Sequence, residues 1–264
     1  MPPPSISVWT FDVYSPMSVD SPLYISRYAR QIPLIEQAGQ AKLAASHICI
    51  AGVGGLGSPI ALYLAAAGVG TLSIIDCDIV SISNLNRQIL HMTSDIGRAK
   101  VESGAEKLHA LNPDIVIRTY QDIITHEFLS EIACEADIII DAVDSYQSRH
   151  ILNEFCVQHK IPFLHGAVQG FLGQMMFIVP ERTACLHCFL PSYEIVPELP
   201  IIGTTAGIIG VMQANEAIKY ITTPEKVSVG EFVLWDGTTL TLEKCIVERN
   251  LECFVCGKGS IAPE

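Results

Sequence analysis

The stretch over residues 51–100 holds the turns and side chains that could carry out nucleotide chemistry. It opens with the glycine turn GVGGLG, in which Gly52, Gly54 and Gly57 have the spacing of a phosphate-binding loop. Glycines let the backbone approach a phosphate closely at a helix N-terminus, where unpaired N–H groups and the helix dipole favour anions. The turn by itself is a weak signal, because dinucleotide-dependent enzymes of many kinds share it.

Three charged residues follow the turn, and two of them indicate which nucleotide is used. Asp76 follows the next predicted strand, nineteen residues after Gly57, where a carboxylate accepts hydrogen bonds from the ribose of NAD or ATP equally well. Arg87 and Lys100 favour ATP, because displacement of pyrophosphate requires cations around the phosphates and hydride transfer does not. Each such contact is worth roughly 2–4 kcal/mol in comparable sites. The competing interpretation is two solvated surface charges, which their place after the second strand disfavours.

Asp144 is a candidate metal ligand. It follows the apolar run at residues 137–141 in the sequence DAVDS, at the carboxyl edge of the expected parallel sheet, where ligands of such folds bind. A carboxylate there can hold Mg²⁺ that bridges the phosphates of ATP. The alternative is that Asp144 only caps the helix that follows Ser145.

The cysteines predict a metal site of another kind. Four of the nine form two Cys-x-x-Cys pairs, Cys185–Cys188 and Cys253–Cys256, and four thiolates are a ligand set that structural zinc prefers. The 64 residues between the pairs exceed the span of a compact zinc ribbon, so the metal would tie the C-terminal segment to an earlier part of the chain. His187 is not needed once four sulfurs bind. Buried reduced cysteines or a redox pair are the alternatives, and Cys245 is expected in the core or beside the zinc.

Hydrophobic periodicity predicts the elements that position these residues. The expected strands cover residues 47–51, 71–76, 115–120, 137–141, 162–166, 174–179, 231–235 and 239–247. The expected helices cover residues 58–67, 96–111, 126–134, 147–159 and 206–220. Strands and helices alternate in the first half, which predicts an α/β fold with a Rossmann-like, mostly parallel sheet and helices on both faces. We expect antiparallel strands in the C-terminal part.

The composition excludes several classes of protein. A length of 264 residues fits one large α/β domain, and 49% hydrophobic with 17% charged residues gives no compositional case for disorder. The net charge of −12 argues against nonspecific binding to nucleic acid or anionic membranes. No apolar run is long enough to cross a bilayer. We therefore expect no membrane and no nucleic-acid partner.

The cysteine pattern and the N-terminus indicate where the protein works and where its domain begins. An odd number of cysteines does not resemble a secreted disulfide framework, and the N-terminus lacks the basic region of a secretory signal. A cytoplasmic location is therefore expected. Five prolines precede Leu23, so we expect residues 1–22 to form a flexible arm. Residues 23–264 are expected to form a single domain with a C-terminal subregion tied by zinc.

Several motifs occur in the order found in one known family. They are RYARQ (27–31), GVGGLG (52–57), DCD (76–78), SNLNRQ (83–88), GRAKVES (97–103), DAVDS (141–145) and the two Cys-x-x-Cys pairs. Together they resemble the ThiF/MoeB/HesA family, the prokaryotic relatives of ubiquitin-activating enzymes. The resemblance extends over about residues 23–257, nearly the whole chain. It implies that the single domain is a ThiF/MoeB-type adenylation domain.

The resemblance implies an activity and assigns roles to residues. Members adenylate the C-terminal glycine carboxylate of a small ubiquitin-like sulfur-carrier protein that ends in Gly-Gly, using ATP and Mg²⁺ and releasing pyrophosphate. The residues that match the ATP and magnesium contacts of the family are Gly55, Asp76, Asn84, Arg87, Lys100 and Asp144, with Ser145 beside them. Arg30 matches an arginine that reaches the ATP of the partner subunit, which implies a homodimer. The loop over residues 192–205 would enclose the tail of the carrier.

One departure from the family pattern limits this chemistry. Several members carry a cysteine in that loop, the crossover loop, and use it to form a thioester or acyl persulfide. This chain has no cysteine between Phe189 and Ile221, and Val196 lies near the expected position. We therefore predict an enzyme that makes the acyl-adenylate and leaves thiol chemistry to another protein.

Three alternatives compete with carrier adenylation. An NAD-dependent oxidoreductase shares the glycine turn but explains neither Arg30, Arg87 and Lys100 nor the cysteine pairs. A related adenylating dehydratase that acts on a modified tRNA base fits less well with the acidic net charge and the zinc cysteines. A noncatalytic scaffold, like the inactive halves of heterodimeric relatives, tends to lose the catalytic arginines that this chain retains.

Overall fold

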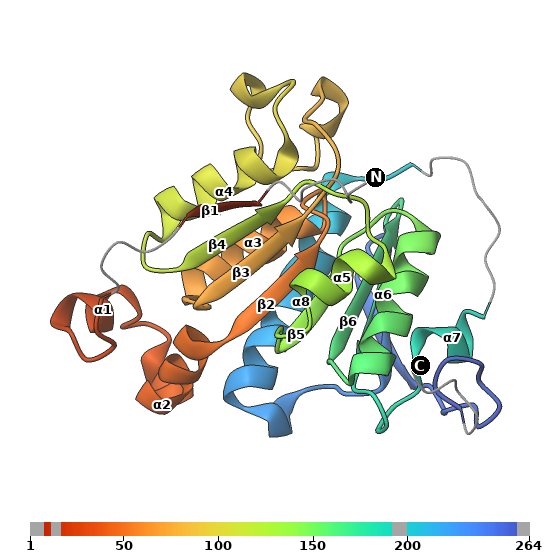
Figure 1. Ribbon diagram of the computed structural model, residues 1–264. Coiled ribbons are helices and arrows are strands. Elements are labelled where there is room, and N and C mark those ends of the chain that lie inside the picture. The colour runs from red at the N-terminus through yellow and green to blue at the C-terminus, as the bar shows by residue number, and fades with distance from the viewer. Residues whose placement is uncertain (1–7, 12–16, 192–199, 258–264) are drawn as a thin grey trace.

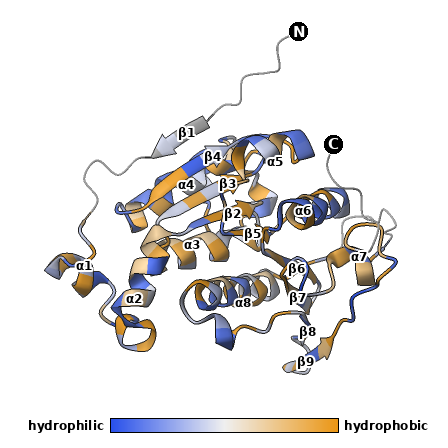
Figure 2. Ribbon diagram, turned by 60° about the horizontal axis from the view of Figure 1, so that its bottom comes forward, coloured by the Kyte–Doolittle hydropathy of each residue, from blue (hydrophilic) through white to orange (hydrophobic). Residues whose placement is uncertain are grey.

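The computed structural model describes residues 8–11, 17–191 and 200–257. Within these ranges nine strands form one sheet in the order β1-β4-β3-β2-β5-β6-β7-β8-β9 (Figures 1 and 2). The strands are β1 (Val8–Phe11), β2 (His47–Ala51), β3 (Thr71–Ile75), β4 (Val116–Tyr120), β5 (Ile138–Asp141), β6 (Phe163–Gln169), β7 (Leu172–Ile178), β8 (Glu231–Asp236) and β9 (Thr241–Ile246). The helices are α1 (Pro22–Arg27), α2 (Ile32–Ala45), α3 (Gly57–Ala67), α4 (Lys100–Leu111), α5 (His126–Ile132), α6 (Tyr146–His159), α7 (Leu186–Phe189) and α8 (Gly203–Thr222).

The middle of the sheet is parallel and covered on both faces. Five adjacent strands are parallel to one another, in the order β4, β3, β2, β5 and β6. β2 reads HICIA and β5 reads IIID, continuous apolar runs that suit strands with helices on both sides. The chain winds from β2 outward to β3 and β4, then continues on the other side of β2 with β5 and β6. Open α/β sheets bind ligands at such a reversal, outside the carboxyl ends of the strands.

Two helical layers enclose the core and confirm the expected α/β fold. α5 and α6 pack on one face of the sheet, and α3, α4 and α8 pack on the other (Figures 1 and 2). The core contains Leu64, Ile74 and Ile209 on one side, and Phe155 and Phe163 on the other. Burial of each such side chain stabilises the fold by roughly 1.5–3 kcal/mol. Among the described residues no helix is both long and apolar enough to cross a membrane.

The edges of the sheet are antiparallel. β6, β7, β8 and β9 pair as successive antiparallel neighbours, as expected for the C-terminal part. At the opposite edge β1 pairs antiparallel with β4, with Val8 opposite Tyr120. β1 lies inside the segment expected as a flexible arm, residues 1–22. Residues 1–7 and 12–16 of that segment lie outside the described ranges.

The structure departs from the sequence expectations at several places, and the unpredicted strand β1 is one of them. The helix expected from residue 96 begins at Lys100, because Gly97 has a φ of 89° and a short 3₁₀ turn precedes it. The expectations omit α1, α2 and α7, because α1 and α7 span less than two turns and α2 is interrupted at Glu36. Cys245 was expected in the core or beside the zinc, and the core placement is wrong. It is exposed on β9, an edge strand whose six residues are all exposed.

Candidate functional site

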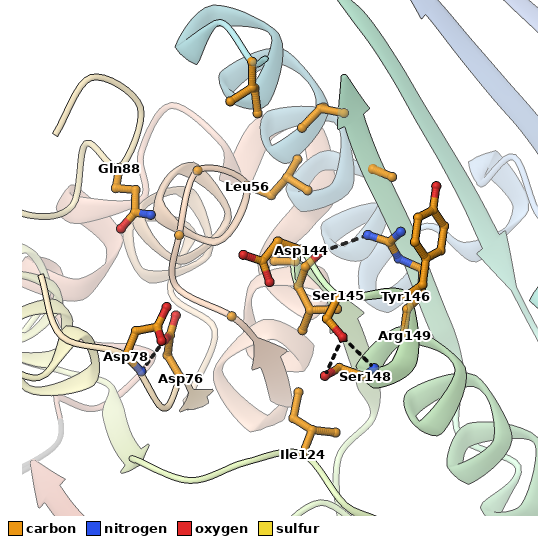
Figure 3. A pocket seen from close by; sticks show the side chains of 18 of the residues that line it. Leu56, Asp76, Asp78, Gln88, Ile124, Asp144, Ser145, Tyr146, Ser148 and Arg149 are labelled. Carbon is orange, nitrogen blue, oxygen red and sulfur yellow. Dashed lines mark hydrogen bonds between the residues drawn. The ribbon is translucent and has the colours of Figure 1, made fainter. Parts of the chain in front are cut away.

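A cleft of about 710 Å³ lies where β2, β3 and β5 end, the position at which this fold binds ligands. The glycine turn after β2 forms one wall, and the hairpin of β6 and β7 forms another. The predicted residues that line it are Gly52, Gly54, Gly55, Asp76, Arg87, Lys100, Asp144 and Ser145. Side chains from separate segments therefore meet in one hollow (Figure 3).

The glycine turn has a backbone shape that requires glycine at two positions. Gly52 has a φ of 94°, and a Cβ there would lie 2.6 Å from the carbonyl oxygen of Ala142. A Cβ on Gly57 would lie 1.9 Å from the carbonyl oxygen of Gly52. The turn leads directly into α3, whose N-cap residue Leu56 lines the cleft. Gly57 is buried and outside the cleft lining, so it shapes the turn rather than offering backbone to a ligand.

Asp76 and Lys100 line the cleft beside the glycine turn. The Asp76 carboxylate accepts hydrogen bonds from the backbone N–H groups of Val53 at 2.9 Å and Asp78 at 3.0 Å. Lys100 Nζ lies 2.8 Å from Asp78 Oδ2 and 3.8 Å from Asp76 Oδ1. Burial raises the pKa of Asp76, an effect that the charge of Lys100 opposes. The pair therefore fixes the turn and holds a buried cation at the edge of the cleft.

Arg87 places a second cation in the cleft, and Asn84 supports it from outside. Arg87 Nη1 donates to the carbonyl oxygen of Ser83 at 3.0 Å. Its Cγ lies 3.5 Å from the position that a Cβ on Gly55 would take, so the side chain runs alongside the glycine turn. Asn84 does not line the cleft. Its side chain is turned back on its own turn, where its Oδ1 accepts a hydrogen bond from the N–H of Ser81 at 3.1 Å. Asn84 thus stabilises the short turn that carries Arg87.

Asp144 projects into the cleft from the loop after β5 (Figure 3). It is exposed, and within the part of the chain that the structure describes its carboxylate makes no hydrogen bond or ion pair. The N-cap of α6 is Ser145, whose Oγ accepts a hydrogen bond from the N–H of Ser148 at 3.1 Å. The helix cap is therefore supplied by Ser145, which leaves Asp144 available for a cation.

A buried ion cluster beneath the cleft was not expected from the sequence. One oxygen of Asp141, at the end of β5, accepts hydrogen bonds from Arg149 Nε and His165 Nδ1, each at 2.8 Å. Burial opposes ionisation of Asp141, but Arg149 and the hydrogen bond from His165 hold its pKa below the ordinary value. Arg149 also donates to the carbonyl oxygen of Val143 at 2.8 Å, next to Asp144 (Figure 3). The one sequence signal for this cluster is Asp141 itself, because a carboxylate at the end of a buried apolar strand requires a partner.

His91 is a second supporting residue that sequence reasoning missed. Its Nε2 lies 3.1 Å from the carbonyl oxygen of Val53 in the glycine turn, and its Nδ1 lies 2.9 Å from Ser103 Oγ on α4. A carbonyl only accepts, so Nε2 carries the proton and Nδ1 accepts from the Ser103 hydroxyl. Burial lowers the pKa of His91, which favours this neutral ring. His91 therefore ties the glycine turn to α4.

The four predicted zinc cysteines come together between α7 and the segment after β9. All four Sγ atoms lie within 4.8 Å of one another, and three of the pairs are 3.5, 3.7 and 4.0 Å apart. A tetrahedral site with Zn–S bonds of about 2.3 Å requires sulfurs about 3.8 Å apart, so the set fits zinc. Burial and the neighbouring thiols raise the pKa of Cys185, and a divalent cation would offset this by stabilising the thiolate. His187 is not part of the cluster.

Two predicted features lie away from the cleft lining. Arg30 is exposed between α1 and α2 and does not line the cleft. Of the expected crossover loop, residues 192–199, which include Val196, lie outside the described ranges. The described remainder contains Ile201, which lines the cleft and forms a bridge with Gly170 after β6. This end of the loop therefore borders the same hollow as the glycine turn.

Comparison with known proteins places this fold and cleft in a family. Residues 28–255 match the family described as the ThiF family. This chain belongs to the ThiF family. The Escherichia coli sulfur carrier protein ThiS adenylyltransferase is 39% identical over 90% of this chain and 97% of its own length. The Haloferax volcanii SAMP-activating enzyme E1 is 34% identical over 90% of each chain. The crystal structure of E. coli MccB has a TM-score of 0.81 over 93% of this chain and 76% of its own, at 20% identity, which shows a shared fold.

The ThiF family match contains every residue that lines the cleft. It also contains Arg30 and three of the four clustered cysteines, and Cys256 is the next residue after it. The cleft and most of the cysteine cluster therefore belong to the ThiF domain itself rather than to an added segment.

Proposed function

We propose that this ThiF family chain uses ATP to adenylate the C-terminal glycine carboxylate of a small ubiquitin-like sulfur-carrier protein that ends in Gly-Gly. Family membership and the names of its relatives make the chain an adenylyltransferase. The observation that carries the proposal is the composition of the cleft. One end holds the glycine turn, two cations and the exposed carboxylate of Asp144, and the other end opens onto the sheet face of β6, β7 and β8. Such a cleft suits a nucleotide placed end to end with an extended polypeptide.

The reaction is an attack of the carrier carboxylate on the α-phosphorus of ATP. A bond forms between a carboxylate oxygen and phosphorus, and the bond from phosphorus to the pyrophosphate oxygen breaks. No proton has to move, because a glycine carboxylate is ionised at neutral pH. Negative charge grows on the leaving group, so fixed donors and cations lower the barrier. Arg87 and Lys100 supply the cations in this proposal, and the glycine turn supplies backbone N–H groups.

Two carboxylates take complementary roles in the proposal. Asp76 follows β3 at the place where a ribose would lie, and its oxygens keep lone pairs beyond those that accept from the backbone. Asp144 fits a magnesium ion, because it is an exposed carboxylate in the cleft without a protein partner among the described residues. Bound Mg²⁺ would neutralise phosphate charge and help to orient the pyrophosphate that leaves.

The proposal ends at the acyl-adenylate, without a thioester on the crossover loop. The loop has no cysteine. Cys77 lies in the cleft lining, but burial and the flanking Asp78 and Asp76 raise the pKa of its thiol and so suppress the nucleophilic thiolate. In this scheme zinc has a structural role, since four sulfurs close its coordination sphere. We also place the protein in the cytoplasm, where its nine cysteines would remain reduced.

We propose a homodimer as the working unit, with Arg30 of one protomer at the ATP site of its partner. Two observations support this arrangement: Arg30 is exposed, and it lies outside the cleft lining of its own chain. A second copy would bring this cation to the phosphates by symmetry, because each subunit of a two-fold dimer offers the same surface to the other.

Exchange of labelled pyrophosphate into ATP tests the proposed function. The zinc-loaded enzyme is incubated with ATP, Mg²⁺ and, one at a time, each small protein of the host that ends in Gly-Gly. We expect exchange with a carrier of this kind, and none when its last glycine is removed, because the attacking carboxylate is then misplaced. A folded, zinc-loaded enzyme that supports exchange with none of these proteins would overturn the proposal.

A further inference from the structure

Gln174 on β7 has a side-chain amide whose direction is set by the buried cluster beneath it. Its Nε2 lies 3.0 Å from His165 Nε2, and His165 Nδ1 lies 2.8 Å from the carboxylate of Asp141. Asp141 and His165 are fully buried, and Arg149 is nearly so. Gln174 sits opposite Ala167 in the β6–β7 hairpin, on the same sheet face as His165 and diagonal to it.

The chemistry of the cluster leaves one arrangement of protons. An ionised carboxylate only accepts, so His165 donates its Nδ1–H to Asp141. Burial lowers the pKa of His165 more than Asp141 raises it, so the ring is neutral and its Nε2 is a bare acceptor. The group of Gln174 that faces His165 must then be the NH₂. The carboxamide oxygen, Oε1, is consequently directed away from His165.

Gln174 faces the cleft between two apolar neighbours, with the side chain of Gln169 diagonal to it on the same sheet face. Gln174 is half-buried and lines the cleft, and its neighbours on the same sheet face are Ala167 on β6 and Leu234 on β8. Leu172, two residues earlier on β7, is also exposed in the lining. Within the described residues Oε1 accepts no hydrogen bond. An oriented acceptor between two apolar neighbours favours a neutral donor, because apolar surroundings disfavour a charged one.

We propose that Gln174 is a specificity residue whose Oε1 accepts a hydrogen bond from a backbone N–H in the C-terminal tail of the carrier. This inference rests on the proposed function and adds a residue that recognises the tail of the carrier. A tail that ends in two glycines has no side chains there, so only its backbone amides can be recognised by hydrogen bonds. His165 acts through Gln174: it fixes the amide so that the oxygen, and not the NH₂ group, points toward the tail.

The Michaelis constants for the two substrates in the exchange assay test the role of Gln174. The carrier is the one that supports exchange with the wild-type enzyme. Gln174→Leu keeps a similar volume and removes the acceptor. We expect it to raise KM for the carrier about tenfold, the loss typical of one hydrogen bond, with KM for ATP unchanged. Gln147→Leu, on the exposed surface of α6 and outside the cleft lining, is the matched control and should change neither constant.

A double-mutant cycle tests whether His165 acts through Gln174. His165→Asn alone keeps a donor for Asp141 and should raise KM for the carrier. In the Gln174→Leu background the same change should add nothing to that KM, even where it lowers the melting temperature. An additive effect would contradict the positioning role of His165.

Failure of this inference is distinguishable from failure of the proposed function. Exchange by the wild-type enzyme with no change in carrier KM for Gln174→Leu would overturn the role of Gln174 alone. An equal rise in both Michaelis constants would also overturn it, because the residue would then support the whole cleft. No exchange with any carrier would overturn the proposed function and this inference together.

Discussion

At the scale of single residues, the cleft holds its charges in place before any substrate is bound. Lys100 is paired with Asp78 and Asp76, and Arg87 is bonded to the backbone of its own turn. Asp144 is the contrasting case, a carboxylate without a partner among the described residues. Groups fixed in this way require little reorganisation when charge develops on pyrophosphate, which is why they stabilise a transition state better than water does.

The change Arg87→Ala tests the contribution of the second cation. Loss of one such contact costs roughly 2–4 kcal/mol of transition-state stabilisation, so we expect the carrier-dependent exchange rate to fall about 30- to 1,000-fold. Zinc content and melting temperature should stay at wild-type values, because Arg87 is only half-buried and bonds to its own turn.

Arg182→Ala is the control for this change, because Arg182 is an exposed arginine outside the cleft lining. It should retain full exchange activity. Equal activity of the two variants would show that Arg87 is a solvated surface charge.

At the scale of elements, the segment between β3 and α4 is the part of the site with the least regular structure. It carries Arg87 and is tied down by Asp95, whose carboxylate accepts hydrogen bonds from the backbone of Met92 at 2.7 Å, from Arg98 at 3.1 Å and from Lys107 on α4. His91 from the same segment reaches the glycine turn. These buried polar contacts replace the ladder of hydrogen bonds that a helix or strand would supply.

The pH dependence of stability tests the Asp95 anchor. Burial alone would raise the pKa of Asp95, but the hydrogen bonds from Lys107 and the Met92 backbone, with the charge of Lys107, outweigh it and lower the pKa to about 2, from 3.8. A lowered carboxyl pKa contributes stability above the unfolded value, and this contribution is lost as the pH falls from about 4 through 2. Asp95→Asn should therefore lower the free energy of unfolding by about 2 kcal/mol at pH 7 and by about half as much at pH 3.

Denaturant titration of wild type and Asp95→Asn at both pH values measures this difference. Any loss of zinc at low pH affects both proteins and cancels in the comparison. A difference that does not change with pH would contradict the assignment of the low pKa to Asp95.

The cysteine cluster joins two segments that are far apart in the chain, and a substitution can test whether it holds zinc. Cys253→Ser should lower the zinc bound per chain and lower the melting temperature by several degrees, because a structural site contributes to folding directly. Cys245→Ser is the matched control, since that thiol is exposed on β9 and outside the cluster. Metal analysis and thermal unfolding measure both effects. Unchanged zinc content in Cys253→Ser would show that the cluster is not the zinc site.

At the scale of the whole molecule, the position of the cleft could be predicted from the strand ends, and the cysteine cluster could be predicted from the spacing of the cysteine pairs. Asp76 and Asp144 follow apolar runs, and the rule that parallel strands end at one edge brings them to one cleft. The meeting of Asp141, His165 and Gln174 could not be predicted, because it depends on the register of three strands. Period-2 patterns show which residues share a face of a strand, but they do not show which residues on neighbouring strands become partners.

The exposure of Cys245 was missed for a related reason. A β-strand pattern does not reveal whether the strand lies in the middle of a sheet or at its edge, and β9 lies at the edge. Position in the sheet is a property of the whole fold, so it has to be read from the structure.

Mixing of inactive subunits tests the homodimer. Arg30→Ala and Asp144→Ala should each abolish exchange, because each removes one group from every site. Subunits co-refolded in equal amounts form heterodimers in half of the population, and each heterodimer has one complete site of two. We therefore expect recovery of about a quarter of the wild-type rate. No recovery, with dimers confirmed by light scattering, would contradict a site shared between subunits.

The intact mass of the carrier after reaction tests the central claim most directly. The enzyme, its carrier, ATP and Mg²⁺ are incubated with pyrophosphatase, which removes the released pyrophosphate, and the mixture is analysed by mass spectrometry with and without reductant. The proposed chemistry predicts a carrier that is heavier by one adenylyl group, with enzyme of unchanged mass under both conditions. A carrier of unchanged mass, or a reducible adduct between enzyme and carrier, would contradict it.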